Sequence, residues 1–81
     1  MTERERMEFA FATRNIVESY QAKLKAEKIE LEKAEILHNS ALIRYNKAVE
    51  EYEFNISQTR EICKERGFSE EEINALVAWR E

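Results

Sequence analysis

Proline and aspartate are missing from this chain of 81 residues, and glycine, cysteine and histidine each occur once. The absence of proline removes the strongest helix breaker, and all 17 acidic residues are glutamates, which tolerate helix interiors well. A single glycine, Gly67, excludes a glycine-rich phosphate loop. A single cysteine, Cys63, excludes an intrachain disulfide and favours a reducing, cytoplasmic setting.

Long apolar runs and clusters of positive charge are also missing. No run approaches the ~20 apolar residues that span a bilayer, and the first residues alternate charged with apolar side chains instead of forming a signal peptide. The net charge is −4, and the 13 basic residues are interspersed with acidic ones. Binding to a phosphate backbone requires a clustered basic patch, so we expect neither a membrane segment nor a nucleic-acid partner.

The residue types that carry catalysis are too few and too far apart. His38 is the only histidine, and it lies about 37 Å from Cys63 if a continuous helix joins them. A catalytic pair or a metal site needs these side chains together. Consecutive glutamates at 70–72 point about 100° apart on a helix and do not converge on one atom. The sequence therefore predicts a protein that is not an enzyme and holds no cofactor or metal.

The residues that are present favour helix throughout. Apolar residues make up 43% of the chain, enough for a core. Thr2 and Glu5 have the spacing of a capping box, which predicts a helix beginning at this point. Between Thr2 and Arg66, apolar side chains fall on two faces when each residue advances by about 100°.

The main apolar face continues in phase from Phe9 to Cys63, and its later part steps by three and four residues as a coiled coil does. Its members are Phe9, Ile16, Val17, Tyr20, Leu24, Leu31, Ala34, His38, Ala41, Leu42, Tyr45, Val49, Tyr52, Ile56 and Cys63. A weaker second apolar face lies roughly opposite, and its members are Met7, Phe11, Ala22, Ala26, Ile29, Ile36, Ile43 and Phe54. A helix with two apolar faces needs more than one neighbour.

Two all-α architectures fit this pattern within a single helical domain covering residues 1–81. The continuous phase favours one long amphipathic helix over residues 2–66, about 90 Å long, with coiled-coil-like packing. The alternative is a helical hairpin that turns at His38, Asn39 and Ser40, where Asn39 or Ser40 caps the second arm.

A sharp corner follows at residues 66–69 in either architecture. Gly67 can adopt the left-handed conformation that ends a helix, with Phe68 contacting Cys63 in a Schellman motif. Ser69 and Glu72 form a second capping box, and Phe68 and Ile73 have the spacing of a hydrophobic staple. We therefore expect a short C-terminal helix over residues 69–80.

Function follows from this architecture as an expectation of protein–protein contact. We expect a small adaptor, scaffold or inhibitor of a larger protein, such as occurs among bacterial and phage regulators, acting as a homodimer. A dimeric nucleic-acid-associated regulator is the alternative. The candidate oligomer interface is Leu24, Leu31, His38, Leu42, Tyr45, Val49, Tyr52 and Ile56, and the candidate partner-binding residues are Phe68, Ile73, Leu76 and Trp79. Trp79 anchors the second set because tryptophan is enriched at binding hot spots.

Overall fold

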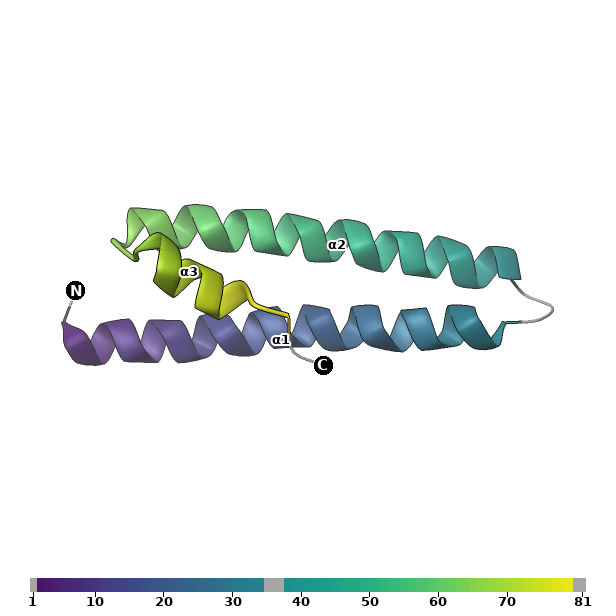
Figure 1. Ribbon diagram of the computed structural model, residues 1–81, viewed down its shortest axis with the longest axis horizontal. Coiled ribbons are helices and arrows are strands. Elements are labelled where there is room, and N and C mark those ends of the chain that lie inside the picture. Colours follow the sequence, from purple (N-terminus) through teal and green to yellow (C-terminus); the bar gives the residue numbers. More distant parts are fainter. Residues whose placement is uncertain (1, 35–37, 80–81) are drawn as a thin grey trace.

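The computed structural model describes residues 2–34 and 38–79. Helix α1 (Glu3–Lys33) and helix α2 (His38–Glu65) form an antiparallel hairpin, and the short helix α3 (Glu70–Val77) folds back against it (Figure 1). The all-α fold and a short C-terminal helix are confirmed, but this helix ends at Val77 and not at residue 80 as predicted. The molecule is elongated, with extents of 53 × 18 × 16 Å.

The favoured single helix over residues 2–66 is wrong, and the hairpin alternative is correct. The reversal also comes earlier than predicted, because α1 ends at Lys33 and residues 38–40 already form the first turn of α2. Continuous phase did not exclude the hairpin, since each arm needs an apolar stripe facing the other arm, and one heptad-spaced pattern supplies both stripes.

The two arms of the hairpin meet along the main apolar face. Val17 on α1 and Cys63 on α2 are fully buried, and Ala41 and Ala48 on α2 are buried as well. Most of the remaining described members of that face are half-buried. On one side, Lys23 pairs with Glu51 at 2.8 Å and Arg44 pairs with Glu27 at 3.3 Å. Coiled-coil-like packing between these arms stays a prediction.

The predicted capping boxes are both confirmed. At the start of α1, the Glu5 amide donates to the Thr2 hydroxyl over 3.1 Å, and the Glu5 carboxylate accepts in return. At the start of α3, the Glu72 amide donates to the Ser69 hydroxyl over 3.2 Å, and the Ser69 amide donates to the Glu72 carboxylate over 2.9 Å. Each box satisfies amides that a helix start leaves without partners.

The corner between α2 and α3 is the predicted Schellman motif. Gly67 has a φ of 84°, and its amide donates to the Lys64 carbonyl over 3.0 Å. The Phe68 amide donates to the Cys63 carbonyl, also over 3.0 Å. Both bonds satisfy carbonyls at the end of α2 and turn the chain back toward α1.

A compact core holds α3 in place at the open end of the hairpin. Cys63, Phe68 and Ile73 are buried together, with Phe9 and Leu76 packed against them. The Phe9 and Phe68 rings lie 5.6 Å apart between centroids, and the Arg6 guanidinium lies 4.2 Å above the Phe68 ring. The predicted staple pair thus contributes to the principal contact between α3 and the hairpin. None of the helices in residues 2–34 and 38–79 combines the length and apolar character that crossing a bilayer demands.

Candidate interaction surfaces

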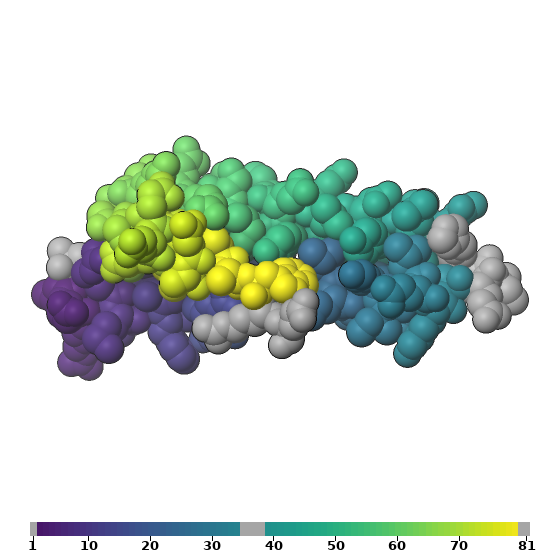
Figure 2. All heavy atoms as spheres, viewed as in Figure 1, coloured from purple at the N-terminus to yellow at the C-terminus, as the bar shows by residue number. Residues whose placement is uncertain are grey.

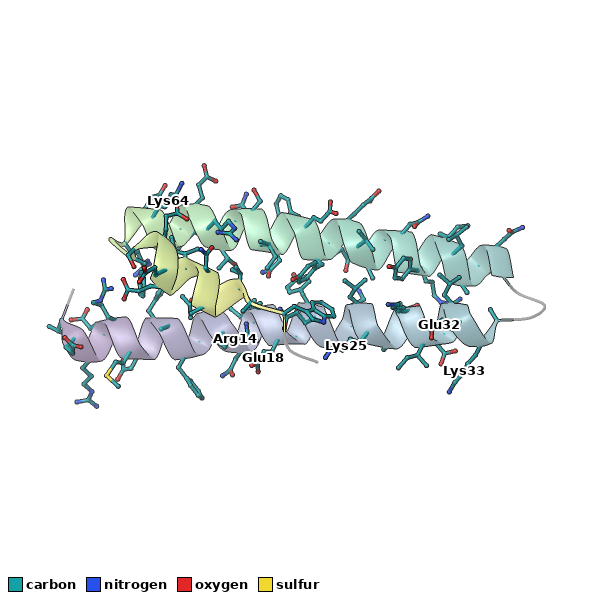
Figure 3. The ribbon with its side chains drawn as sticks, viewed as in Figure 1. Arg14, Glu18, Lys25, Glu32, Lys33 and Lys64 are labelled. Carbon is teal, nitrogen blue, oxygen red and sulfur yellow. The ribbon has the colours of Figure 1, made fainter. Side chains whose placement is uncertain are left out.

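The C-terminal end of α3 is capped by a side chain from another helix. Arg14 on α1 is only 9% exposed, and it lies beneath the end of α3 (Figure 3). Its Nη1 donates to the carbonyls of Leu76 and Ala78, over 2.7 Å in each case, and its Nε donates to Glu18 over 2.9 Å. A positive charge at this position also complements the negative end of the helix dipole.

Gln21, two turns after Arg14 on α1, completes this cap. It is 3% exposed, and its Nε2 donates to the Ala78 carbonyl over 2.9 Å. The last turn of α3 contains no basic residue of its own, so α1 supplies the groups that satisfy its final carbonyls. Sequence reasoning missed both residues because it followed apolar side chains. A signal was nevertheless present in the sequence. Arg14 and Gln21 are seven residues apart, so they lie on the same side of α1, next to Val17.

Trp79 lies directly beyond this cap and is 42% exposed. Its ring meets the Tyr52 ring edge-on, with centroids 5.6 Å apart and planes at 87°, and the Lys25 ammonium lies 5.3 Å from its centroid. In the space-filling view, α3 lies across one face of the hairpin (Figure 2). Trp79 therefore packs on side chains of α1 and α2 and remains partly exposed to solvent.

The predicted partner-binding residues divide between the core and the surface. Ile73 is 0% exposed and Phe68 is also buried, so both contribute to the fold. Leu76 is half-buried beside them. Trp79 is the member of the set that offers a large exposed side chain, and its role in binding stays a prediction.

The predicted oligomer interface lies largely on the inner side of the hairpin. Its half-buried members are Leu24, Leu31, Tyr45, Val49, Tyr52 and Ile56. Leu42 remains partly exposed, and the side chain of His38 lies outside the described residues. Much of the face that was expected to meet a second chain therefore packs within one chain, and its role in oligomerisation stays a prediction.

The second apolar face is exposed wherever the structure describes it. Phe11 on α1 is 71% exposed and Phe54 on α2 is 68% exposed. The hairpin divides this face between two helices, and Ile36 lies outside the described residues. The part on α1 consists of Met7, Phe11, Ala22, Ala26 and Ile29, all exposed, and is named here the α1 outer stripe.

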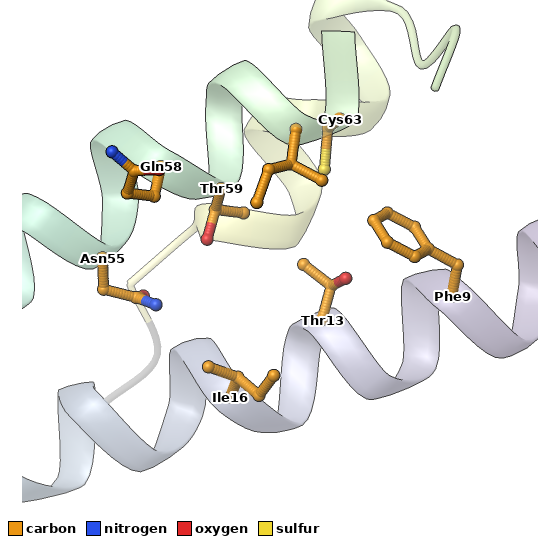
Figure 4. Close-up of a pocket in the computed structure, with 8 residues that line it drawn as sticks. Phe9, Thr13, Ile16, Asn55, Gln58, Thr59 and Cys63 are labelled. Atoms are coloured by element: carbon orange, nitrogen blue, oxygen red, sulfur yellow. The ribbon is translucent and has the colours of Figure 1, made fainter. Parts of the chain in front are cut away.

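A groove of about 200 Å³ opens between α1 and α2, with α3 running behind its lining residues (Figure 4). It is lined by Phe9, Thr13, Ile16, Asn55, Gln58, Thr59, Ile62 and Cys63. The Asn55 Oδ1 is buried without a hydrogen-bond partner. Burial raises the pKa of the Cys63 thiol, opposed by the nearby Arg66 charge. A thiol with a raised pKa is less nucleophilic at neutral pH than an ordinary thiol.

The charged side chains pair across the surface of the hairpin and α3. Arg6 meets Glu72 at 2.8 Å, and Lys64 meets Glu70 at 3.5 Å. Within residues 2–34 and 38–79, no group of three histidine, cysteine or acidic side chains is placed to hold a metal ion. Comparison with known proteins gives no assignment, since no protein-family model, curated protein or solved structure matches the chain.

Proposed function

We propose that this protein is a non-enzymatic interaction module, an adaptor, scaffold or inhibitor that docks on a larger protein and acts as a homo-oligomer. The observation that carries the proposal is the amount of large apolar surface left exposed after the three helices have packed. These exposed side chains are Met7, Phe11, Ile16, Ile29, Leu42, Ile43, Phe54, Ile62 and Trp79. Extended exposed apolar surface is a mark of protein contact sites.

Trp79 is the best-supported contact with a larger partner. Its side chain is large and amphipathic, and it packs against Tyr52 in the unbound protein. A side chain that is already ordered loses little conformational freedom on binding. The glutamates of α3 add little attraction for a basic partner, because Glu72 pairs with Arg6 and Glu70 with Lys64. The proposed contact is therefore mainly apolar.

The test places a photo-crosslinking phenylalanine analogue at position 79 in the cells that naturally make the protein. The matched control carries the analogue at Glu61, an exposed position on α2. We expect one larger protein to be crosslinked from position 79 and not from position 61. The same product from both positions, or none from 79, would contradict a contact through Trp79.

Trp79→Ala then measures the contribution of this side chain to the contact with the captured protein. A hot-spot tryptophan contributes at least ~2 kcal/mol to binding, and truncating a core tryptophan costs about 3–5 kcal/mol of folding stability. Because the ring is 42% exposed, we expect a large loss of affinity with a much smaller loss of stability. The reverse result would assign Trp79 to the core.

The nucleic-acid-associated alternative has no specific observation in its favour. Several cations that it would require are paired with glutamates, including Arg4, Arg6 and Lys23. We expect no shift of a labelled oligonucleotide at low salt. A shift that weakens steeply as salt rises would revive this alternative.

A further inference from the structure

We infer that Arg14 and Gln21 on α1 are positioning residues for Trp79, which they hold in place through the peptide group that precedes it. This inference rests on the proposed contact through Trp79 and deepens it, because it names the side chains that control how that contact is presented. It is carried by a network of buried hydrogen bonds between α1 and the residue that joins α3 to Trp79.

Trp79 lies beyond the end of the helix that precedes it. Helix α3 ends at Val77, and Ala78 has a non-helical backbone with φ −57° and ψ 138°. Within the described ranges, the backbone hydrogen bonds at turns and caps include none from the amides of Ala78 or Trp79. Regular secondary structure therefore does not fix the position of Trp79, and side chains from elsewhere in the fold must do so.

The Ala78 carbonyl accepts hydrogen bonds from two side chains of α1. The Arg14 Nη1 donates to it over 2.7 Å, and the Gln21 Nε2 donates to it over 2.9 Å. A carbonyl oxygen has two lone pairs, so these two bonds complete its hydrogen bonding. Because the donors come from different turns of α1, they restrict the direction of the carbonyl as well as its distance from the helix.

The peptide group transmits this restraint to Trp79. The Ala78 carbonyl lies in one plane with the nitrogen and the Cα of Trp79, because the C–N bond has partial double-bond character. Fixing the carbonyl oxygen therefore limits where the Trp79 Cα can lie, and two side-chain torsions then place the ring. The ring meets the Tyr52 ring with centroids 5.6 Å apart. Arg14 and Gln21 thus act on Trp79 through the backbone.

The two positioning side chains are themselves restrained, and both are buried. The Arg14 Nε donates to Glu18 over 2.9 Å, and its Nη2 donates to the Gln21 Oε1 over 3.5 Å. The Gln21 amide therefore accepts from Arg14 and donates to Ala78, which fixes its orientation. Buried polar networks with satisfied members are rigid, so this one is a firm support for the peptide group before Trp79.

Capping of α3 alone would not require this arrangement. The Arg14 bond to the Leu76 carbonyl, over 2.7 Å, satisfies an acceptor in the last turn of the helix. The two bonds to Ala78 lie beyond the last helical residue and add no bond to the helix itself. They act instead on the segment that carries Trp79, which is the part of this end that remains exposed.

Holding Trp79 in place before binding raises its affinity for a partner. A protein whose binding-competent arrangement is present only part of the time loses affinity in proportion to that fraction. If removal of the Gln21 donor lowers the fraction to about one tenth, the dissociation constant rises about tenfold. Gln21 can have this effect without contacting the partner, since its side chain is buried.

The fluorescence of Trp79 tests the positioning without any partner, because the chain contains no other tryptophan. Gln21→Met keeps a long, flexible side chain and removes the donor to Ala78. Arg14→Lys, the second variant, keeps the positive charge and loses the planar fork that reaches several acceptors. In both we expect faster anisotropy decay, from added nanosecond motion, and acrylamide quenching shifted toward that of free N-acetyltryptophanamide.

Thr2→Ala is the matched control for a general loss of stability. It removes the capping box about 18 Å along α1 from Arg14 and destabilises the fold away from Ala78. All variants are compared where circular dichroism shows full native helicity, so unfolded chains do not contribute. We expect Thr2→Ala to leave the fluorescence of Trp79 unchanged. Equal changes in the control and in Gln21→Met, or no change in Gln21→Met, would overturn the inference.

Binding to the protein captured from position 79 tests the consequence for affinity. We expect Gln21→Met to weaken this binding about tenfold, and to have no further effect in a chain that already carries Trp79→Ala. An additive loss in the double variant would place Gln21 in the contact itself and contradict a positioning role. The fluorescence measurement needs no partner, so failure of the positioning and failure of the proposed contact are distinguished.

Discussion

At the scale of single residues, the side chain that organises the surface around Trp79 is Arg14. It is buried, charged and bonded to two carbonyls at the end of α3. Removing it leaves those carbonyls with fewer donors in a water-poor position. We expect Arg14→Leu to lower the free energy of unfolding by about 2 kcal/mol, because unsatisfied buried polar groups cost about 1–3 kcal/mol. Urea denaturation followed by circular dichroism measures the change.

Arg4 is the matched control for this prediction, since it also pairs with a glutamate four residues later on α1. Its side chain is 89% exposed, and exposed pairs of this kind contribute little. We expect Arg4→Leu to change stability by less than about 0.5 kcal/mol. Equal effects of the two substitutions would show that the Arg14 cap does not stabilise α3.

Gly67 carries a second residue-scale prediction. A Cβ added at this position meets no atom within 4 Å, so Gly67→Ala introduces no clash. The φ of 84° is nevertheless unfavourable for alanine. We expect a loss of about 1 kcal/mol from backbone conformation alone. Thermal melts compare the variant with Gly67→Asn, which tolerates this region better and is expected to lose less. A raised melting temperature for Gly67→Ala is incompatible with this corner.

At the scale of helices, the starts of α1 and α3 and the end of α2 were predictable because capping uses short, local sequence patterns. The Thr2 and Ser69 boxes and the Gly67 corner are each set by residues within a few positions of one another. The hairpin was not resolved by the same reasoning, because periodicity states which face is apolar and does not state what covers it. The cap formed by Arg14 and Gln21 depends on contacts more than 50 positions apart.

The candidate surfaces were predicted in part for the same reason. Phe11 and Phe54 were recognised as members of a second apolar face, and both are exposed. Phe68 and Ile73 were assigned to a partner surface, whereas the return of α3 onto the hairpin buries them. Whether an apolar side chain faces a partner or the core depends on tertiary packing, which a local pattern does not encode.

Attachment of α3 to α1 is expected to depend on pH through Glu72. Its pKa is lowered because its carboxylate accepts the Ser69 backbone amide and then a hydrogen bond from Arg6. A lowered folded-state pKa stabilises the fold above the ordinary glutamate value, and this contribution is lost as pH falls through the lowered pKa. We expect Glu72→Gln to reduce the acid sensitivity of the urea midpoint below about pH 5.

Glu71→Gln is the control for this acid sensitivity, because it changes one charge in the same turn and leaves the capping box intact. Midpoints at pH 7, 5 and 4 are compared for the two variants and the parent chain. A parallel decline in all three proteins would remove Glu72 from the acid response of α3.

At the scale of the whole molecule, the main apolar face has two possible uses. In the hairpin, one arm covers the other within a single chain. Its continuous phase would also let two chains open between Lys33 and His38 and exchange arms, giving a dimer built on long helices. Such a dimer would resemble the predicted architecture over residues 2–66.

Small-angle X-ray scattering distinguishes these two uses by length. The hairpin has extents of 53 × 18 × 16 Å, whereas exchanged arms would form a helix about 90 Å long over residues 2–66. Because α1 and α2 already cover each other within one chain, we expect the longest dimension to stay well short of about 90 Å at every protein concentration. A particle about 90 Å long with twice the mass of 9.7 kDa would identify exchanged arms as the basis of association.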